Sequence, residues 1–179
     1  MAADADAAAR AERRERARAD RERTIAYLDL QEGRGSVPVL DDDGIERALR
    51  ATRRIAVIGA SSRPDRPSHG VFRTLLRRGF DAVPVNPRER EVLGVPAFAS
   101  LADAVAATGR FELVDVFRRS ELCVPHAHEA VEAGAQYLWL QLGIVNWEAA
   151  RIAHEAGLEV VMDRCTAIEL GRIGLTLPR

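Results

Sequence analysis

The chain has 179 residues, 47% of them hydrophobic and 30% charged, with a formal net charge of −1, so it fits one globular domain and has no overall field that attracts nucleic acid. All 26 basic residues are arginine, which excludes a Schiff-base lysine, a P-loop lysine and every other ammonium chemistry. No apolar run approaches the roughly 20 residues that cross a bilayer and the first residues lack a secretory leader, so we expect a cytoplasmic protein without a membrane partner.

The N-terminal segment has a composition of its own. Residues 1–24 alternate alanine with charged residues and contain almost no large apolar side chains. Such a segment can be helical but cannot pack against a core, so we expect a solvated helix or a frayed tail. An irregular stretch around Gly33 follows, and the aspartates at 41–43 mark the start of a short helix. The sequence therefore predicts a charged helical or flexible extension over residues 1–40 and a domain over residues 41–179.

From residue 54 onward, apolar runs of strand length alternate with amphipathic stretches of helical period. Strands are predicted over residues 55–60, 80–85, 113–117, 137–142 and 159–162, and helices over residues 68–78, 124–133 and 146–156. Gly79, Gly134 and Gly157 follow where each helix should end. This alternation indicates right-handed βαβ units. The predicted fold class is α/β, a Rossmann-like three-layer sandwich with a five-stranded, mainly parallel sheet.

The loop after the first predicted strand is the first candidate binding segment, because ligands of such sheets lie beyond the carboxyl ends of the strands. Its small residues allow a diphosphate to approach the backbone, and the amides of the following helix start can bind an anion. Two arginines in the loop could supply charge. A tight turn without a ligand remains the alternative. The candidate phosphate-binding residues are Gly59, Ala60, Ser61, Ser62, Arg63 and Ser68.

The residues after the second predicted strand favour a nucleotide that carries a phosphate on its ribose. A dinucleotide enzyme would show Gly-x-Gly-x-x-Gly in the first loop and an acidic residue about 20 positions later, and both are missing. The chain instead has Asn86, Pro87 and Arg88, and an arginine here suits a ribose phosphate better than a free diol. Coenzyme A has both a 3′-phosphate and a diphosphate, so it fits better than NAD. A solvated role for each arginine remains open.

Six segments between about residues 50 and 170 resemble the coenzyme A-binding protein family related to the nucleotide-binding domain of succinyl-CoA synthetase. They are IAVIGAS at 55–61, PVNP at 84–87, SLAD at 100–103, DVFRR at 115–119, WLQLGI at 139–144 and VMDRC at 161–165. The resemblance implies a Rossmann-like domain that binds coenzyme A or an acyl-CoA.

Carried over to this chain, the resemblance also implies roles for single residues. Gly59, Ala60 and Ser61 would hold the phosphates. Asn86, Pro87 and Arg88 would flank the adenosine. Phe117 and Arg118 would wall the crevice at the end of the next strand. The N-terminal extension lies outside the usual outline of the family.

The histidines and cysteines suggest neither a metal site nor a clear catalytic group. His126 and His128, two positions apart on a predicted helix, point in different directions and make a poor metal pair. His69, near a helix start, could touch a phosphate, but we expect a solvated or capping role. Cys165 follows the last strand and could form a mixed disulfide with the thiol of coenzyme A, with a half-buried structural role as the alternative. We therefore predict no catalytic residue and no metal ligand.

These observations favour a non-catalytic coenzyme A-binding, storage or regulatory protein, and the fold suggests a homodimer by analogy. One alternative is an NAD(P)-binding oxidoreductase, which the missing ribose-binding carboxylate weakens. Another is an acyl-CoA-processing enzyme subunit, but the chain is too short to contain an ATP-grasp partner domain. A third is an interaction protein whose arginine-rich tail carries the function.

Overall fold

The computed structural model describes the backbone of residues 2–178 and the side chains of residues 10–178. Its contacts divide the chain into two compact units, Met1–Ser36 and Val37–Arg179. The division at residues 40 and 41 that the sequence predicts remains a prediction.

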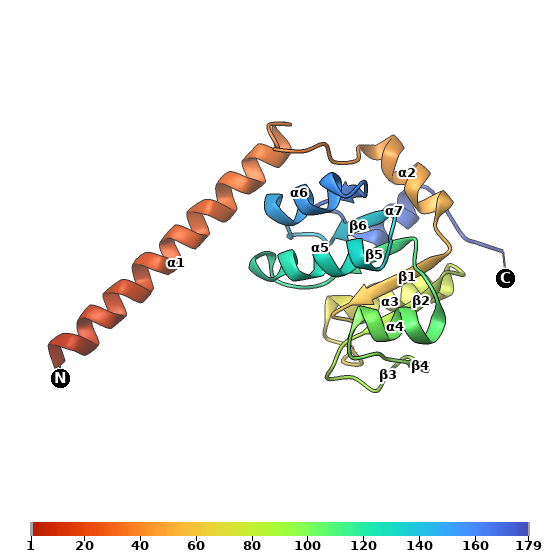
Figure 1. Cartoon of the computed structure of the whole chain (residues 1–179), viewed down its shortest axis with the longest axis horizontal. Coiled ribbons are helices and arrows are strands. Elements are labelled where there is room, and N and C mark those ends of the chain that lie inside the picture. The colour runs from red at the N-terminus through yellow and green to blue at the C-terminus, as the bar shows by residue number, and fades with distance from the viewer. Residues whose placement is uncertain (1, 179) are drawn as a thin grey trace. The chain divides into compact units, whose positions relative to one another are not determined.

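The first unit contains one long helix, α1 (Ala2–Gln31) (Figure 1). Its exposed surface has ion pairs one turn apart, such as the 2.8 Å pair between Arg18 and Glu22, which support the helix locally. The helix continues beyond residue 24 to Gln31. Gly33, two residues later, has a φ of 65°, a left-handed conformation that cannot continue the helix. In the described part of the chain, no helix is both long and apolar enough to cross a membrane, and the charges of α1 account for this.

The second unit is built on a sheet of five parallel strands in the order β2–β1–β5–β6–β7. Their bounds are β1 Arg54–Ile58, β2 Asp81–Val85, β5 Leu113–Val116, β6 Tyr137–Leu140 and β7 Glu159–Val161. Nearly every strand residue is buried, because helices cover both faces and each strand can be apolar throughout. The predicted five-stranded sheet is confirmed. Strand β2 ends where predicted, and the other strands end one or two residues before their predicted ends.

Helices form the two outer layers of this unit (Figure 1). On one face α2 (Asp42–Ala51), α3 (Pro67–Arg77) and α7 (Thr166–Arg172) share a core with the sheet that includes Leu49, Phe72 and Trp139. On the other face lie α4 (Leu101–Thr108), the 3-10 turn η1 (Ser120–Leu122), α5 (Cys123–Glu132) and α6 (Trp147–Glu155). This arrangement is the predicted Rossmann-like three-layer sandwich.

Helices α4 and α7, the turn η1 and a small hairpin lie outside the predicted set. Strands β3 (Glu91–Val92) and β4 (Val95–Pro96) pair as a small antiparallel hairpin around Gly94. Helix α4 has a recognisable start, because the Ser100 hydroxyl accepts a hydrogen bond from the Asp103 N–H at 3.1 Å and donates to its carboxylate at 2.7 Å. An eight-residue helix of small apolar residues has too little periodicity to be predicted without this cap.

Candidate functional site

The winding of the sheet reverses between β1 and β5, and this switch point is where open parallel sheets bind ligands. Backbone hydrogen bonds join the strand ends there. The Gly59 N–H donates to the Val85 carbonyl at 2.8 Å, and the Phe117 N–H donates to the Ile58 carbonyl at 2.9 Å. The three loops that the sequence singled out, after β1, β2 and β5, therefore begin side by side.

Gly59 lies where the loops after β1 and β5 come close together. Its φ is 82°, a region that favours glycine, and a Cβ added there would lie 2.5 Å from the Phe117 carbonyl oxygen. The ends of β1 and β5 are in direct backbone contact at this point. Only glycine allows that contact without a shift of the backbone.

Asn86 ties the second loop to the first. Its Nδ2 donates to the Ala60 carbonyl at 2.7 Å, and its Oδ1 accepts from the Arg88 N–H at 3.0 Å. Both polar ends of the side chain are thus used inside the protein. In this structure Asn86 fixes the shape of the two loops, while Pro87 and Arg88 are exposed.

Glu89 is a functional candidate that sequence reasoning missed. One of its carboxylate oxygens, Oε1, accepts from the Ser61 hydroxyl at 3.0 Å and from the Ser62 N–H at 2.9 Å. Hydrogen bonds from Ser62, and then from Ser61, hold the pKa of Glu89 below its usual value. A carboxylate from the loop after β2 therefore contacts the loop after β1, which the sequence assigned to phosphate binding. The only available signal was an acidic residue directly after Arg88.

His69 and Ser68 support the same loop from the start of α3. His69 is only 7% exposed and its Nδ1 lies 3.0 Å from the Ser61 carbonyl oxygen, so the solvated role expected for it is wrong. Ser68 is also buried. Loop and helix start form one packed unit, and this unit fixes the backbone of Ser61.

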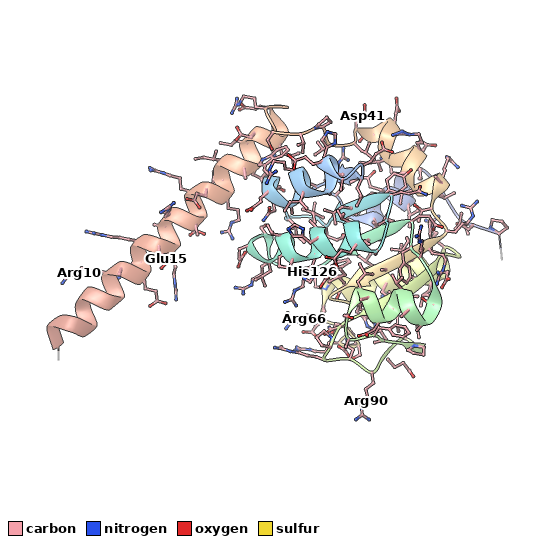
Figure 2. All side chains as sticks on the ribbon, viewed as in Figure 1. Arg10, Glu15, Asp41, Arg66, Arg90 and His126 are labelled. Carbon is pink, nitrogen blue, oxygen red and sulfur yellow. The ribbon has the colours of Figure 1, made fainter. Side chains whose placement is uncertain are left out.

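The candidate arginines lie at the surface. Arg63 is exposed and pairs with Asp65 at 2.7 Å, a contact that competes with any anion. Arg88 and Arg118 are exposed on the loops after β2 and β5. Arg90, beyond Arg88, projects outward (Figure 2). Phe117 is partly buried and packs against the core.

A buried polar cluster joins β5, β6 and α7 close to the strand ends. Asp115, which is fully buried, accepts from the Gln141 Nε2 at 2.8 and 2.9 Å and from the Thr166 hydroxyl at 3.1 Å. Burial raises the pKa of Asp115 to about 7, against the lowering effect of these two donors. The cluster contains no cationic side chain, so the carboxylate is held by neutral donors alone.

Cys165 has the half-buried surroundings of its structural alternative, and Trp139 lies in the core. Cys165 precedes α7 and packs, partly buried, against the core. Trp139 is completely buried, and its Nε1 donates to the Arg164 carbonyl at 2.6 Å. Trp139 is therefore a core residue, and its ring cannot stack on a base.

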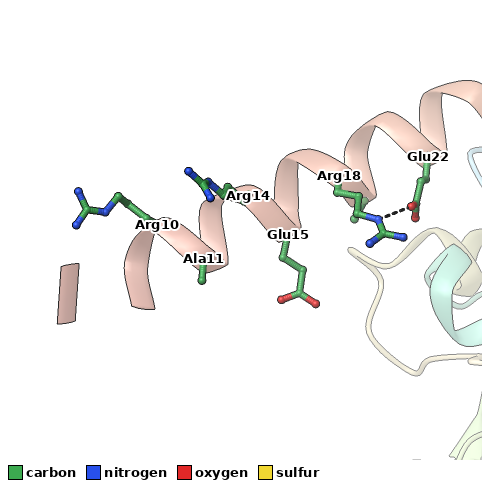
Figure 3. A pocket seen from close by; sticks show the side chains of 7 residues that line it. Arg10, Ala11, Arg14, Glu15, Arg18 and Glu22 are labelled. Carbon is green, nitrogen blue, oxygen red and sulfur yellow. Dashed lines mark hydrogen bonds and ion pairs between the residues drawn. The ribbon is translucent and has the colours of Figure 1, made fainter. Parts of the chain in front are cut away.

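A hollow in the surface of the first unit lies along α1 (Figure 3). It is lined by that helix alone, with Arg10, Arg14, Arg18 and Glu22 spaced four residues apart. One helix face cannot enclose a ligand, so it carries no site. Within the described residues, no group of three or more His, Cys, Asp or Glu side chains could hold a metal ion.

Comparison with known proteins identifies the family. The family model described as a CoA binding domain matches residues 53–171. An uncharacterised protein of Bacillus subtilis, YneT, is 42% identical over 124 residues, which cover 69% of this chain and 90% of that protein. A solved structure of a hypothetical protein from Pyrococcus horikoshii OT3 is 36% identical, with a TM-score of 0.70, and the match covers 74% of this chain and 92% of that one.

A further relative has a named activity. Subunit alpha of the ADP-forming acetate–CoA ligase II of Pyrococcus furiosus is 30% identical over 127 residues, which are 65% of this chain but only 27% of that subunit. The chain thus spans about a quarter of the ligase subunit. Sequence, sheet order and these relatives agree, and the family supports coenzyme A binding in general: the chain belongs to the CoA-binding domain family.

Proposed function

We propose that the domain over residues 41–179 binds coenzyme A or an acyl-CoA at the carboxyl ends of β1, β2 and β5, as a non-catalytic binding, storage or regulatory protein. The observation that carries this proposal is the joining of three loops at the switch point. The Asn86 bond to the Ala60 carbonyl and the contact of Gly59 with Phe117 hold them in one arrangement. A preformed arrangement of the loops reduces the entropy lost on binding.

In this proposal each loop contacts a different part of the ligand. The loop after β1, with Gly59, Ala60, Ser61, Ser62 and Arg63, holds the diphosphate next to Ser68 at the start of α3. Asn86 and Pro87 shape the place of the adenosine, and Arg88 contacts the 3′-phosphate. Phe117 and Arg118 line the other wall.

An acyl-CoA-processing subunit is the second candidate function. It is favoured by the identity with the acetate–CoA ligase subunit, of which this chain spans 27%. An oxidoreductase that binds NAD(P) has less support, because the loop after β1 lacks the Gly-x-Gly-x-x-Gly pattern of dinucleotide-binding enzymes. A homodimer, and a mixed disulfide between Cys165 and coenzyme A, remain predictions.

A thermal-shift panel tests the proposed ligand. Coenzyme A is expected to raise the melting temperature with the logarithm of its concentration once that concentration exceeds Kd, while NAD is expected to leave it unchanged. Acetyl-CoA should behave as coenzyme A does if the thiol end lies outside the contacts. Stabilisation by NAD alone would refute the proposal. Turnover of an acyl-CoA in a partner's presence would favour the second function.

Arg88 offers a sharper test of the ligand's orientation. We expect Arg88→Ala to weaken coenzyme A binding about tenfold, the effect of losing one charge-assisted contact, and to leave dephospho-CoA binding unchanged. Calorimetric titration of both ligands measures this. Arg77→Ala is the matched control, because Arg77 is an exposed arginine in the last turn of α3, the far end of that helix from Ser68. Equal weakening of both ligands would contradict the 3′-phosphate role.

A further inference from the structure

Glu89 makes contacts that a phosphate oxygen would make. Its Oε1 accepts from one hydroxyl, that of Ser61, and from one backbone N–H, that of Ser62. Both donors belong to the loop between β1 and α3. An oxygen of a diphosphate needs the same kind of donors, a backbone N–H near a helix start and a hydroxyl. The carboxylate therefore occupies one oxygen position of an anion site.

Other backbone groups of the loop already have hydrogen-bond partners within the protein. The Gly59 N–H is bonded to the Val85 carbonyl, and the Arg63 N–H is bonded to the Ser61 Oγ at 3.2 Å. The Ser61 carbonyl oxygen is held by His69. A diphosphate that accepts hydrogen bonds from the Ser61 hydroxyl and the Ser62 N–H therefore competes with Glu89 for these two donors.

Two anions cannot share these donors. Like charges a few ångströms apart repel strongly at a protein surface, and neither could be neutralised by the hydroxyl or the N–H. Glu89 is only partly buried, and it lies in the turn that its own N–H closes to the Asn86 carbonyl at 3.2 Å. Its side chain can thus leave for solvent without unpacking the core.

We propose that Glu89 is an internal competitor of the ligand's diphosphate, which must displace the carboxylate from Ser61 and Ser62. This inference rests on the proposed function and deepens it. Glu89 fixes the loop in a binding shape but lowers its affinity for every ligand that places a phosphate there. Since Glu89 follows Arg88 directly, the displacement of the Glu89 carboxylate and the contact of Arg88 with the ligand occur in the same short turn.

The consequence is a selective effect on ligands. Removing the charge of Glu89 should tighten the binding of coenzyme A and of inorganic pyrophosphate, and it should not affect pantetheine, which has no phosphate. A charge-assisted hydrogen bond is roughly twice as strong as a neutral one, so we expect a gain of about threefold to tenfold in Glu89→Gln. Glu89→Ala, which also removes the hydrogen-bond acceptor, should gain at least as much.

Calorimetric titration of the full chain with coenzyme A, pyrophosphate and pantetheine is the test. The matched control is Glu91→Gln, because Glu91 is an exposed carboxylate two residues along at the start of β3, and it should bind all three ligands as the original chain does. Circular dichroism and melting temperatures check that each variant is folded.

The outcomes separate the two proposals. Tighter binding of coenzyme A and pyrophosphate in both Glu89 variants, with pantetheine unchanged, supports the inference. Unchanged or weaker binding in both variants, while the original chain binds coenzyme A, overturns the inference and leaves the proposed function standing. Tighter pyrophosphate with no coenzyme A binding in any variant keeps the anion competitor and defeats the proposed ligand. No binding of any phosphate ligand defeats both.

Discussion

Gly59→Ala is expected to lower the free energy of unfolding by about 3 kcal/mol, from the left-handed backbone and a close contact together. The φ of 82° is unfavourable for alanine, and the added Cβ would lie 2.5 Å from the Phe117 carbonyl oxygen. That oxygen belongs to backbone at the end of a buried central strand, so it cannot move aside as a flexible side chain would. Urea unfolding followed by circular dichroism measures the loss.

Gly94→Ala separates the two causes. Gly94 has nearly the same φ, 83°, but a Cβ there meets nothing within 4 Å, because Gly94 lies in the exposed turn of the β3–β4 hairpin. It should therefore lose only about 1 kcal/mol, the cost of the backbone conformation. If both variants lose the same amount, the contact between β1 and β5 has no energetic weight at Gly59.

Asp115→Asn is expected to make the protein more stable at pH 8, and to stabilise it by clearly less at pH 5. Burial raises the pKa of Asp115 from 3.8 to about 7, so the folded protein holds this proton more tightly than the unfolded chain does. The contribution of the group to stability then falls as the pH rises from about 4 to about 7 and is constant above. The shift corresponds to about 4 kcal/mol, an upper value for the gain in the variant.

Asparagine suits this test because it keeps the shape and one acceptor. Its Oδ1 can still accept from Gln141, and the Thr166 hydroxyl can turn to accept from the new amide. Urea unfolding of both proteins from pH 5 to pH 8 gives the difference between them. Asp43→Asn is the control, since it removes an exposed carboxylate in the first turn of α2, outside the buried cluster. Parallel curves for Asp115→Asn and the original chain would contradict the buried titration.

The sheet and three of its helices could be predicted because each is encoded locally. The runs IAVI and YLWL are apolar without a break, which indicates strands covered on both faces, and each helix is followed by a glycine that ends it. Helix α4 and the β3–β4 hairpin could not, since their few apolar residues produce no clear period. Their positions depend on the packing of their neighbours against the sheet.

The candidate site also has a part that could be predicted from the sequence and a part that could not. The ends of parallel strands meet at one edge, so the loops containing Gly59, Asn86 and Phe117 could be assigned to one crevice from the alternation of strands and helices alone. The contacts within it could not. Glu89 lies 28 positions from Ser61, and Asp115 lies 51 from Thr166.

The sequence by itself determined the fold class and which strand ends meet at one edge of the sheet. Only the tertiary structure decided that His69 is buried behind Ser61, that Glu89 holds the donors assigned to phosphate, and that Asp115 is a buried acid. The physical reason is that a pattern of apolar residues reports which face is covered, whereas a hydrogen bond depends on a distance and an angle between two side chains. That geometry exists only once the loops are folded together.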